Sequence, residues 1–186
     1  NPGLNELRIF GQAATGVGGA TVYSAATVDL QHTITAVNDA PVAAASTLTT
    51  IAEDDADGSN TGTLVSALVT NFTDVDSGAV KGLAVTSVVT TNGTWYYSTN
   101  AGSTWTTLTG VSTSAARLLK GDDANYKVRF VPNANYNGTA TLTYQAWDQT
   151  SGTAGATADV TTNGLSTAFS SNTETATITA ATASPT

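Results

Sequence analysis

Apolar and hydroxyl-bearing residues alternate along much of the chain. Threonine recurs at every second position beside Val, Ile, Leu or Tyr, and this period places successive side chains on the two faces of a β-strand. No stretch combines a helical period with a capping box. Strands are therefore predicted over 47–53, 62–69, 82–90, 93–99, 127–131, 139–147 and 173–180.

Turn signals separate these runs. Asn-Gly dipeptides, which tolerate the positive φ angles of tight turns, occur at 92–93, 137–138 and 163–164. Large aromatic side chains such as Trp95 and Phe130 lie inside the runs, which excludes a disordered threonine-rich linker. Many short antiparallel strands joined by tight turns predict an all-β sandwich of two sheets.

Composition narrows the classes of partner. The chain has 186 residues with 14 acidic and 6 basic side chains, so its net charge is −8, and it contains no cysteine or methionine. Disulfides and thiolate chemistry are excluded, and the negative charge disfavours nucleic acid and anionic membranes and favours cations. No apolar run approaches the ~20 residues of a membrane span, so membrane insertion is not expected.

A boundary between two modules is predicted near TAVNDAPV at 35–42. A loose internal repeat relates the segment that begins at Leu7 to the segment that begins at Leu142, and both end in a TITA strand. Pro41 lacks an N–H and has a fixed φ, so it suits a joint rather than an interior strand. Residues 1–37 are therefore interpreted as the last strands of a preceding repeat, and residues 38–186 as a full module.

Three motifs together resemble the cadherin-like repeats of large bacterial surface proteins, including the VCBS-type repeats of RTX adhesins. They are TAVNDAPV, FTDVDSG at 72–78 and RFVPNANYNGTATLTYQAWD at 129–148. The resemblance implies a Greek-key sandwich of the Ig/cadherin-like type, an extracellular or cell-surface location, and calcium held by short acidic motifs between tandem repeats. The C-terminal ITAATASPT departs from this pattern, because no second VNDAP follows it.

Carboxylates gather in the predicted turns rather than on the strands. Calcium prefers six to eight oxygen ligands, which such turns supply from carboxylates, amides and carbonyls. In Asp74-Val75-Asp76, alternation predicts both acids on one side and Val75 towards the core. Solvated turn caps are the alternative interpretation. Matching the motifs of the resembled family and the acidic turns gives the predicted calcium ligands: Asn38, Asp39, Glu53, Asp55, Asp74, Asp76, Asp123 and Asp148.

A second motif suggests a different ligand. Residues 98–105, STNAGSTW, resemble the Asp-box turn with Asn100 in place of the aspartate. Aromatic side chains around this turn, Trp95, Tyr97 and Trp105, suit stacking on sugars, so a carbohydrate-binding adhesion domain is an alternative function. The competing interpretation places alternate aromatics of one strand in the core.

Catalysis has little support in the sequence. His32 lies on a predicted strand without a nearby G-x-S-x-G or H-E-x-x-H motif, and the Asp122-Asp123 pair suits a turn. The protein is therefore predicted not to be an enzyme. Its expected partners are neighbouring repeats or copies of itself, with a surface glycan as a further option. If residues 1–37 docked on another copy by strand addition, the molecule would be a filament subunit.

Overall fold

A computed structural model describes residues 35–54 and 58–182. The chain divides into two units, Asn1–Ala36 and Val37–Thr186, and the following description concerns the second. The strands predicted before residue 35, including the one with His32, lie outside the described residues. Asp55, a predicted calcium ligand, lies outside them too.

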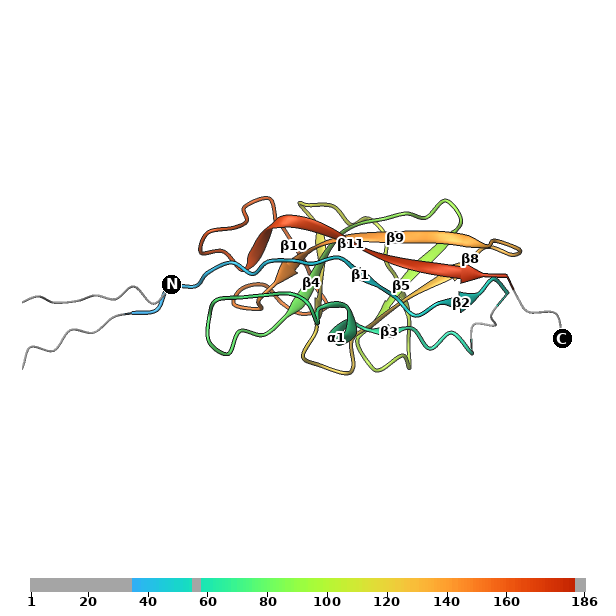
Figure 1. The fold of residues 1–186 in the computed structure, drawn as a ribbon, viewed down its shortest axis with the longest axis horizontal. Coiled ribbons are helices and arrows are strands. Elements are labelled where there is room, and N and C mark those ends of the chain that lie inside the picture. The colour runs from blue at the N-terminus through green and yellow to red at the C-terminus, as the bar shows by residue number, and fades with distance from the viewer. Residues whose placement is uncertain (1–34, 55–57, 183–186) are drawn as a thin grey trace, which may run out of the picture. The chain divides into compact units, whose positions relative to one another are not determined.

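The regular secondary structure of the described unit is almost entirely β-strand (Figure 1). A single turn of helix, α1 (Val65–Leu68), interrupts them. The strands are β1 (Ser46–Thr47), β2 (Ile51–Ala52), β3 (Thr63–Leu64), β4 (Gly82–Val88), β5 (Gly93–Ser98), β6 (Thr106–Thr107), β7 (Ala116–Lys120), β8 (Lys127–Pro132), β9 (Gly138–Trp147), β10 (Thr157–Ala158) and β11 (Phe169–Ala181).

The strands form two sheets. The larger has the order β1-β11-β9-β4-β7-β10, with β2 also paired to β11, and the smaller has the order β3-β8-β5-β6. The chain crosses from one sheet to the other after β2, β3, β4, β6, β7 and β8, so strands that pair are often distant in sequence. This arrangement confirms the predicted all-β, Greek-key sandwich. β1 and β2 run parallel to β11, whereas the other named pairs are antiparallel.

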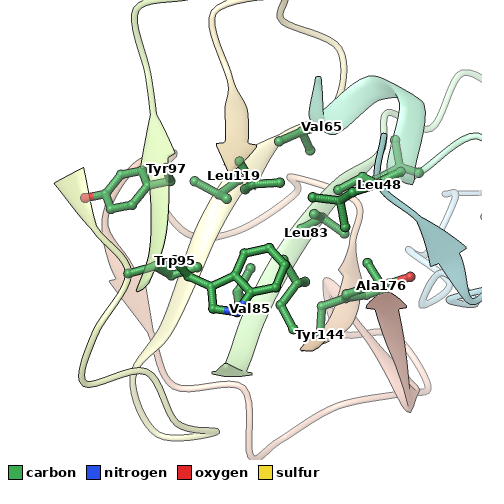
Figure 2. Close-up of a cluster of buried hydrophobic side chains, with 14 of the residues drawn as sticks. Leu48, Val65, Leu83, Val85, Trp95, Tyr97, Leu119, Tyr144 and Ala176 are labelled. Atoms are coloured by element: carbon green, nitrogen blue, oxygen red, sulfur yellow. The ribbon is translucent and has the colours of Figure 1, made fainter. Parts of the chain in front are cut away.

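The core lies between the two sheets (Figure 2). Leu83 and Val85 of β4 and Tyr144 of β9 come from the larger sheet, and Trp95 comes from β5 of the smaller; all four are 0% exposed. The rings of Trp95 and Phe130 pack with centroids 5.2 Å apart. Burial of each such side chain contributes about 1.5–3 kcal/mol, so this layer supplies much of the stability.

A second apolar cluster covers the outer face of the larger sheet at one end. Leu118 and Trp147 pack there with Ala84 and Phe169. The loop after β9 folds over them, because the Trp147 indole donates to the carbonyl of Ser151 at 2.7 Å. Both faces of β4 are consequently buried from Gly82 to Thr86, and the simple alternation of buried and exposed positions is lost there.

Two predicted strands are shorter than expected, and three strands were not predicted: β7 and the two-residue strands β6 and β10. Residues 62–69 form only the two-residue β3 followed by α1, which corrects the prediction of a continuous strand there. Residues 47–53 provide two short strands, β1 and β2. The sequence pattern missed β7, because adjacent Leu118 and Leu119 are both buried, on opposite faces, and no alternation is visible.

Candidate functional site at the linker end

The predicted linker is fastened to the domain along its length. Val42 and Thr73 exchange backbone hydrogen bonds at 2.8 and 3.1 Å, and the Ala40 N–H donates to the carbonyl of Leu165 at 2.7 Å. The amide side chain of Asn172 then pairs with both backbone groups of Ala43, at 2.9 and 3.1 Å, as a neighbouring strand would. The linker is therefore part of the folded unit rather than a free tether.

Asn38 ties the linker to the end of β9. Its side-chain Nδ2 donates to Asp148 Oδ2 at 2.8 Å and to the carbonyl of Thr167 at 3.2 Å. Asp148 is 2% exposed, and its other oxygen accepts hydrogen bonds from the N–H and hydroxyl of Thr150 at 2.8 and 2.6 Å. Neutral donors from Asn38 and Thr150 thus satisfy the hydrogen-bonding capacity of this buried carboxylate.

Asp74 and Asp76 meet the linker on its other side. The N–H of Asp39 donates to Asp76 Oδ2 at 2.8 Å, and the N–H of Asp76 donates to Asp74 Oδ1 at 2.9 Å. The second oxygen of Asp74 is buried and has no hydrogen-bond partner within the described residues. A buried acceptor without a donor costs about 1–3 kcal/mol, and more when it is charged, so this oxygen has an unmet need for a positive partner.

The structure corrects one detail of this turn. Val75 was predicted to face the core, but it is 72% exposed. Asp74 to Asp76 form a turn rather than a strand, since the Asp76 N–H folds back onto the side chain two residues before it. The two acids are half-buried because the turn, rather than a strand's alternation, directs them inward.

Five predicted ligands therefore gather at one end of the domain: Asn38, Asp39, Asp74, Asp76 and Asp148. Two others lie elsewhere. Glu53 accepts a 3.4 Å hydrogen bond from the Asn137 amide, and Asp123 accepts one from the Asn125 N–H at 2.9 Å within its own turn. Within residues 35–54 and 58–182, no group of three or more His, Cys, Asp or Glu side chains is close enough to hold a metal by itself.

Calcium fits part of this arrangement. The orphaned oxygen of Asp74 and the neighbouring carboxylate of Asp76 are hard oxygen donors of the type that calcium prefers. Two carboxylates leave most of a coordination sphere to backbone carbonyls and water. No sequence motif marked Asn172, which bonds the linker at Ala43, or Thr150, which bonds Asp148, because both are ordinary strand or loop residues until the fold brings them there.

The predicted sugar platform is not formed. Trp95 is 0% exposed and Tyr97 9% exposed, and both lie in the core between the sheets, so neither offers a face to a ligand. The ring of Trp105 is half-buried, and the Arg129 guanidinium covers it at 4.4 Å from the ring centroid. The prediction that these three aromatics form one platform is therefore wrong, while a surface glycan as partner stays a prediction. The competing interpretation, with alternate aromatics in the core, is confirmed for β5.

The turn that resembles an Asp-box is a self-contained structural unit. Asn100 Oδ1 accepts hydrogen bonds from the Ser98 hydroxyl and the Thr104 N–H, both at 2.9 Å. The Ser98 hydroxyl oxygen in turn accepts the N–H of Gly102 at 2.9 Å. The amide of Asn100 thus organises the turn, and these contacts leave its polar groups occupied within the hairpin.

The two-sheet sandwich defines the class of protein as an immunoglobulin-like β-domain. The family model described as Bacterial Ig domain matches residues 38–161, which is most of the chain, and the chain therefore belongs to this family. Such domains are generally non-enzymatic structural modules that typically occur in surface proteins. The Ig-like part of the predicted resemblance is confirmed, while the cadherin-like, VCBS-type assignment stays a prediction.

The searches of curated proteins and of solved structures found no match for this chain. In the described part of the chain, no helix has both the length and the apolar character that crossing a membrane requires.

Proposed function

We propose that this domain is a non-catalytic structural module of a bacterial cell-surface or secreted protein, and that calcium stabilises its linker end. The observation that carries the proposal is the buried, unpartnered oxygen of Asp74 beside Asp76, whose carboxylate is bonded to the linker. The family match supports the structural, non-catalytic part. A location outside the cell and neighbouring repeats as partners accord with the kind of protein in which such domains occur.

Asp74 and Asp76 would hold the ion. Bound calcium supplies the positive charge that a buried carboxylate lacks when its donors are missing. The chain's own contribution is positional: the Asp39 N–H orients Asp76, and the Asp76 N–H orients Asp74. Among the described residues, this turn offers two carboxylates and no group of three or more acidic side chains, so we expect a weak site, with a Kd of about 0.1–1 mM, in the range typical of extracellular modules.

The same contacts explain what such a site would do for a module. The linker lies between the turn at Asp76 and the end of β9 at Asp148, and one hydrogen bond reaches each of them. An ion that fixes the Asp76 turn would therefore fix the direction in which the chain leaves the domain at residue 37. Without the ion, repulsion between neighbouring carboxylates would loosen the turn and the linker together.

Thermal unfolding with chelator and with calcium tests this proposal. At about 10 mM calcium and a Kd of ~1 mM, linkage adds about 1.4 kcal/mol, which corresponds to a rise in Tm of about 3–6 °C for a domain of this size. Magnesium at the same concentration should give a smaller rise, since it gives up its water ligands reluctantly.

Asp74→Asn should abolish the calcium-dependent rise and increase the Tm in chelator, because the unpartnered charge is removed. Asp159→Asn is the matched control, since Asp159 also lies in a turn and accepts from the N–H of the residue two positions later, at 2.9 Å. It should keep the calcium response. An identical Tm in calcium and in chelator for the unmodified protein would refute the proposed calcium site.

A further inference from the structure

The first and last strands of the described unit lie side by side and parallel. β1 pairs with Ala176 and Thr177 of β11, and β2 pairs with Ala180 and Ala181. The backbone N–H of Leu48 donates to the carbonyl of Thr177, and the N–H of Glu53 donates to that of Ala181, both at 2.8 Å. Figure 1 shows this N-terminal segment running along β11.

Parallel pairing places the entry and the exit of the chain at opposite ends of the unit. The chain enters beside Asp148 and Thr167, where Asn38 is bonded, and β11 ends beside Glu53. If the two ends of the unit are pulled apart, β1 and β2 are drawn one way along their axis and β11 the other way. The hydrogen bonds between them run across that axis, so they are loaded together rather than one after another.

Side chains strengthen the same junction. The Tyr144 hydroxyl of β9 donates to the carbonyl of Ala44 at 2.7 Å and contacts the hydroxyl of Ser46 at 3.2 Å. Burial raises the pKa of Tyr144, so its hydroxyl keeps the proton that it donates. Leu48, between β1 and β2, is 6% exposed and anchored in the core.

The opposite partner of this junction is also well held. β11 is paired with β9 in continuous antiparallel register from Thr173 to Ala180, in the interior of the larger sheet. A pulling force on β11 is therefore shared with β9. The N-terminal segment pairs with β11 over fewer residues than β9 does, so of these two junctions it is the one that separates first.

We propose that residues 43–53 and β11 form a force-bearing clamp that resists stretching of the chain between its two ends. Because the bonds of the clamp break together, the barrier to forced unfolding is high in this direction, and forced unfolding is governed by that barrier rather than by equilibrium stability. The proposal rests on the proposed function in one respect: a module in a surface protein is loaded through its two ends.

Single-molecule pulling in two directions tests the clamp. The chain has no cysteine, so introduced thiols give unique attachment points in the full-length protein. Val37→Cys with Thr182→Cys pulls the clamp lengthwise. In the protein with Asp54→Cys and Thr182→Cys, the force is applied at one end of the junction, so it separates β2 and then β1 from β11 one hydrogen bond at a time. All three positions are exposed. We expect a severalfold higher unfolding force in the first direction, with equal chemical stability of the two proteins.

A matched pair of tyrosine variants tests the role of the junction itself. Tyr144→Phe removes the hydroxyl that holds Ala44, whereas Tyr136→Phe removes a similar hydrogen bond, 2.8 Å to the carbonyl of Thr139, inside the β8–β9 turn. At a fixed lengthwise force, Tyr144→Phe should unfold about fivefold faster, as the loss of one hydrogen bond predicts, while Tyr136→Phe should not change the rate.

Equal unfolding forces in the two directions would overturn the clamp, and so would equal rates for the two tyrosine variants. The direction comparison uses side chains outside the core, so it stays decisive if Tyr144→Phe folds poorly. All pulling is done first in chelator. If the two directions differ in unfolding force in chelator but calcium does not change the Tm, the calcium site is refuted and the clamp stands. If the two directions give equal forces but calcium still raises the Tm, the clamp is refuted and the calcium site stands.

Discussion

At the scale of single residues, Leu165 has an unfavourable backbone conformation. Its φ is 53°, in the left-handed region, and its side chain is 91% exposed, so no burial offsets the backbone conformation. The conformation has a structural use, because it presents the Leu165 carbonyl to the linker N–H of Ala40. A residue that adopts this region readily would serve the same purpose with less strain.

Leu165→Asn should stabilise the domain. A bulky L-residue in the left-handed region costs roughly 1–2 kcal/mol, and asparagine visits that region more easily, so we expect a gain of about 1 kcal/mol. The readout is the urea midpoint at constant slope. Val75→Asn is the control, since Val75 is also exposed but is not among the residues with positive φ, and it should change the midpoint little. An unchanged midpoint for Leu165→Asn would show that the turn carries no such strain.

Residue types in turns were predictable, but their long-range partners were not. Asp, Asn and Gly favour turns for local reasons, so the sequence placed Asp74 and Asp76 in a turn beside a candidate site. The contact between Asn38 and Asp148 joins positions 110 residues apart and depends on the order of the strands in the sheet. Val75 was misplaced because a period of two was applied to a segment that is not a strand.

At the scale of elements, β7 shows where periodicity fails. A strand with one face in water alternates, whereas a strand covered on both sides reads as a continuous apolar run. Leu118 faces the outer cluster and Leu119 the core between the sheets. Similarly, the short strands β1 and β2 pair in parallel with β11, and no local sequence pattern predicts this pairing. The long strands β9 and β11 were predictable because much of their length has one exposed face.

Leu118→Ala and Leu119→Ala should therefore destabilise the domain by similar amounts. Both side chains are 0% exposed, and truncation of a buried leucine costs about 2–5 kcal/mol. Chemical denaturation of the two variants, compared with the unmodified protein, gives both free energies. If Leu118→Ala cost less than about 1 kcal/mol, the outer cluster would be a loose covering rather than a second core.

At the scale of the whole molecule, fold and charge were predictable from different properties of the sequence. Alternation and turns predicted a sandwich, and composition gave a net charge of −8. Neither could predict that the outer face of the larger sheet would be covered at one end, because the apolar cluster there joins Ala84, Leu118 and Trp147 from three strands that are distant in sequence. The excess of carboxylates has a global consequence, since like charges repel and destabilise the compact state.

Monovalent salt should stabilise this domain, and the effect should be separable from that of calcium. Raising NaCl from about 0.01 to 1 M shortens the screening length from about 30 to 3 Å, so the mutual repulsion of the acidic side chains weakens. We expect the Tm to rise with NaCl equally in the unmodified protein and in Asp74→Asn. Calcium added at constant high ionic strength should then raise the Tm of the unmodified protein only, because a bound ion acts locally while screening acts on all charges.

A Tm that falls with NaCl would show that attractive pairs, such as Lys120 with Asp122 at 3.9 Å, outweigh the net repulsion. A calcium effect that vanishes in high salt would reduce the proposed site to ordinary screening.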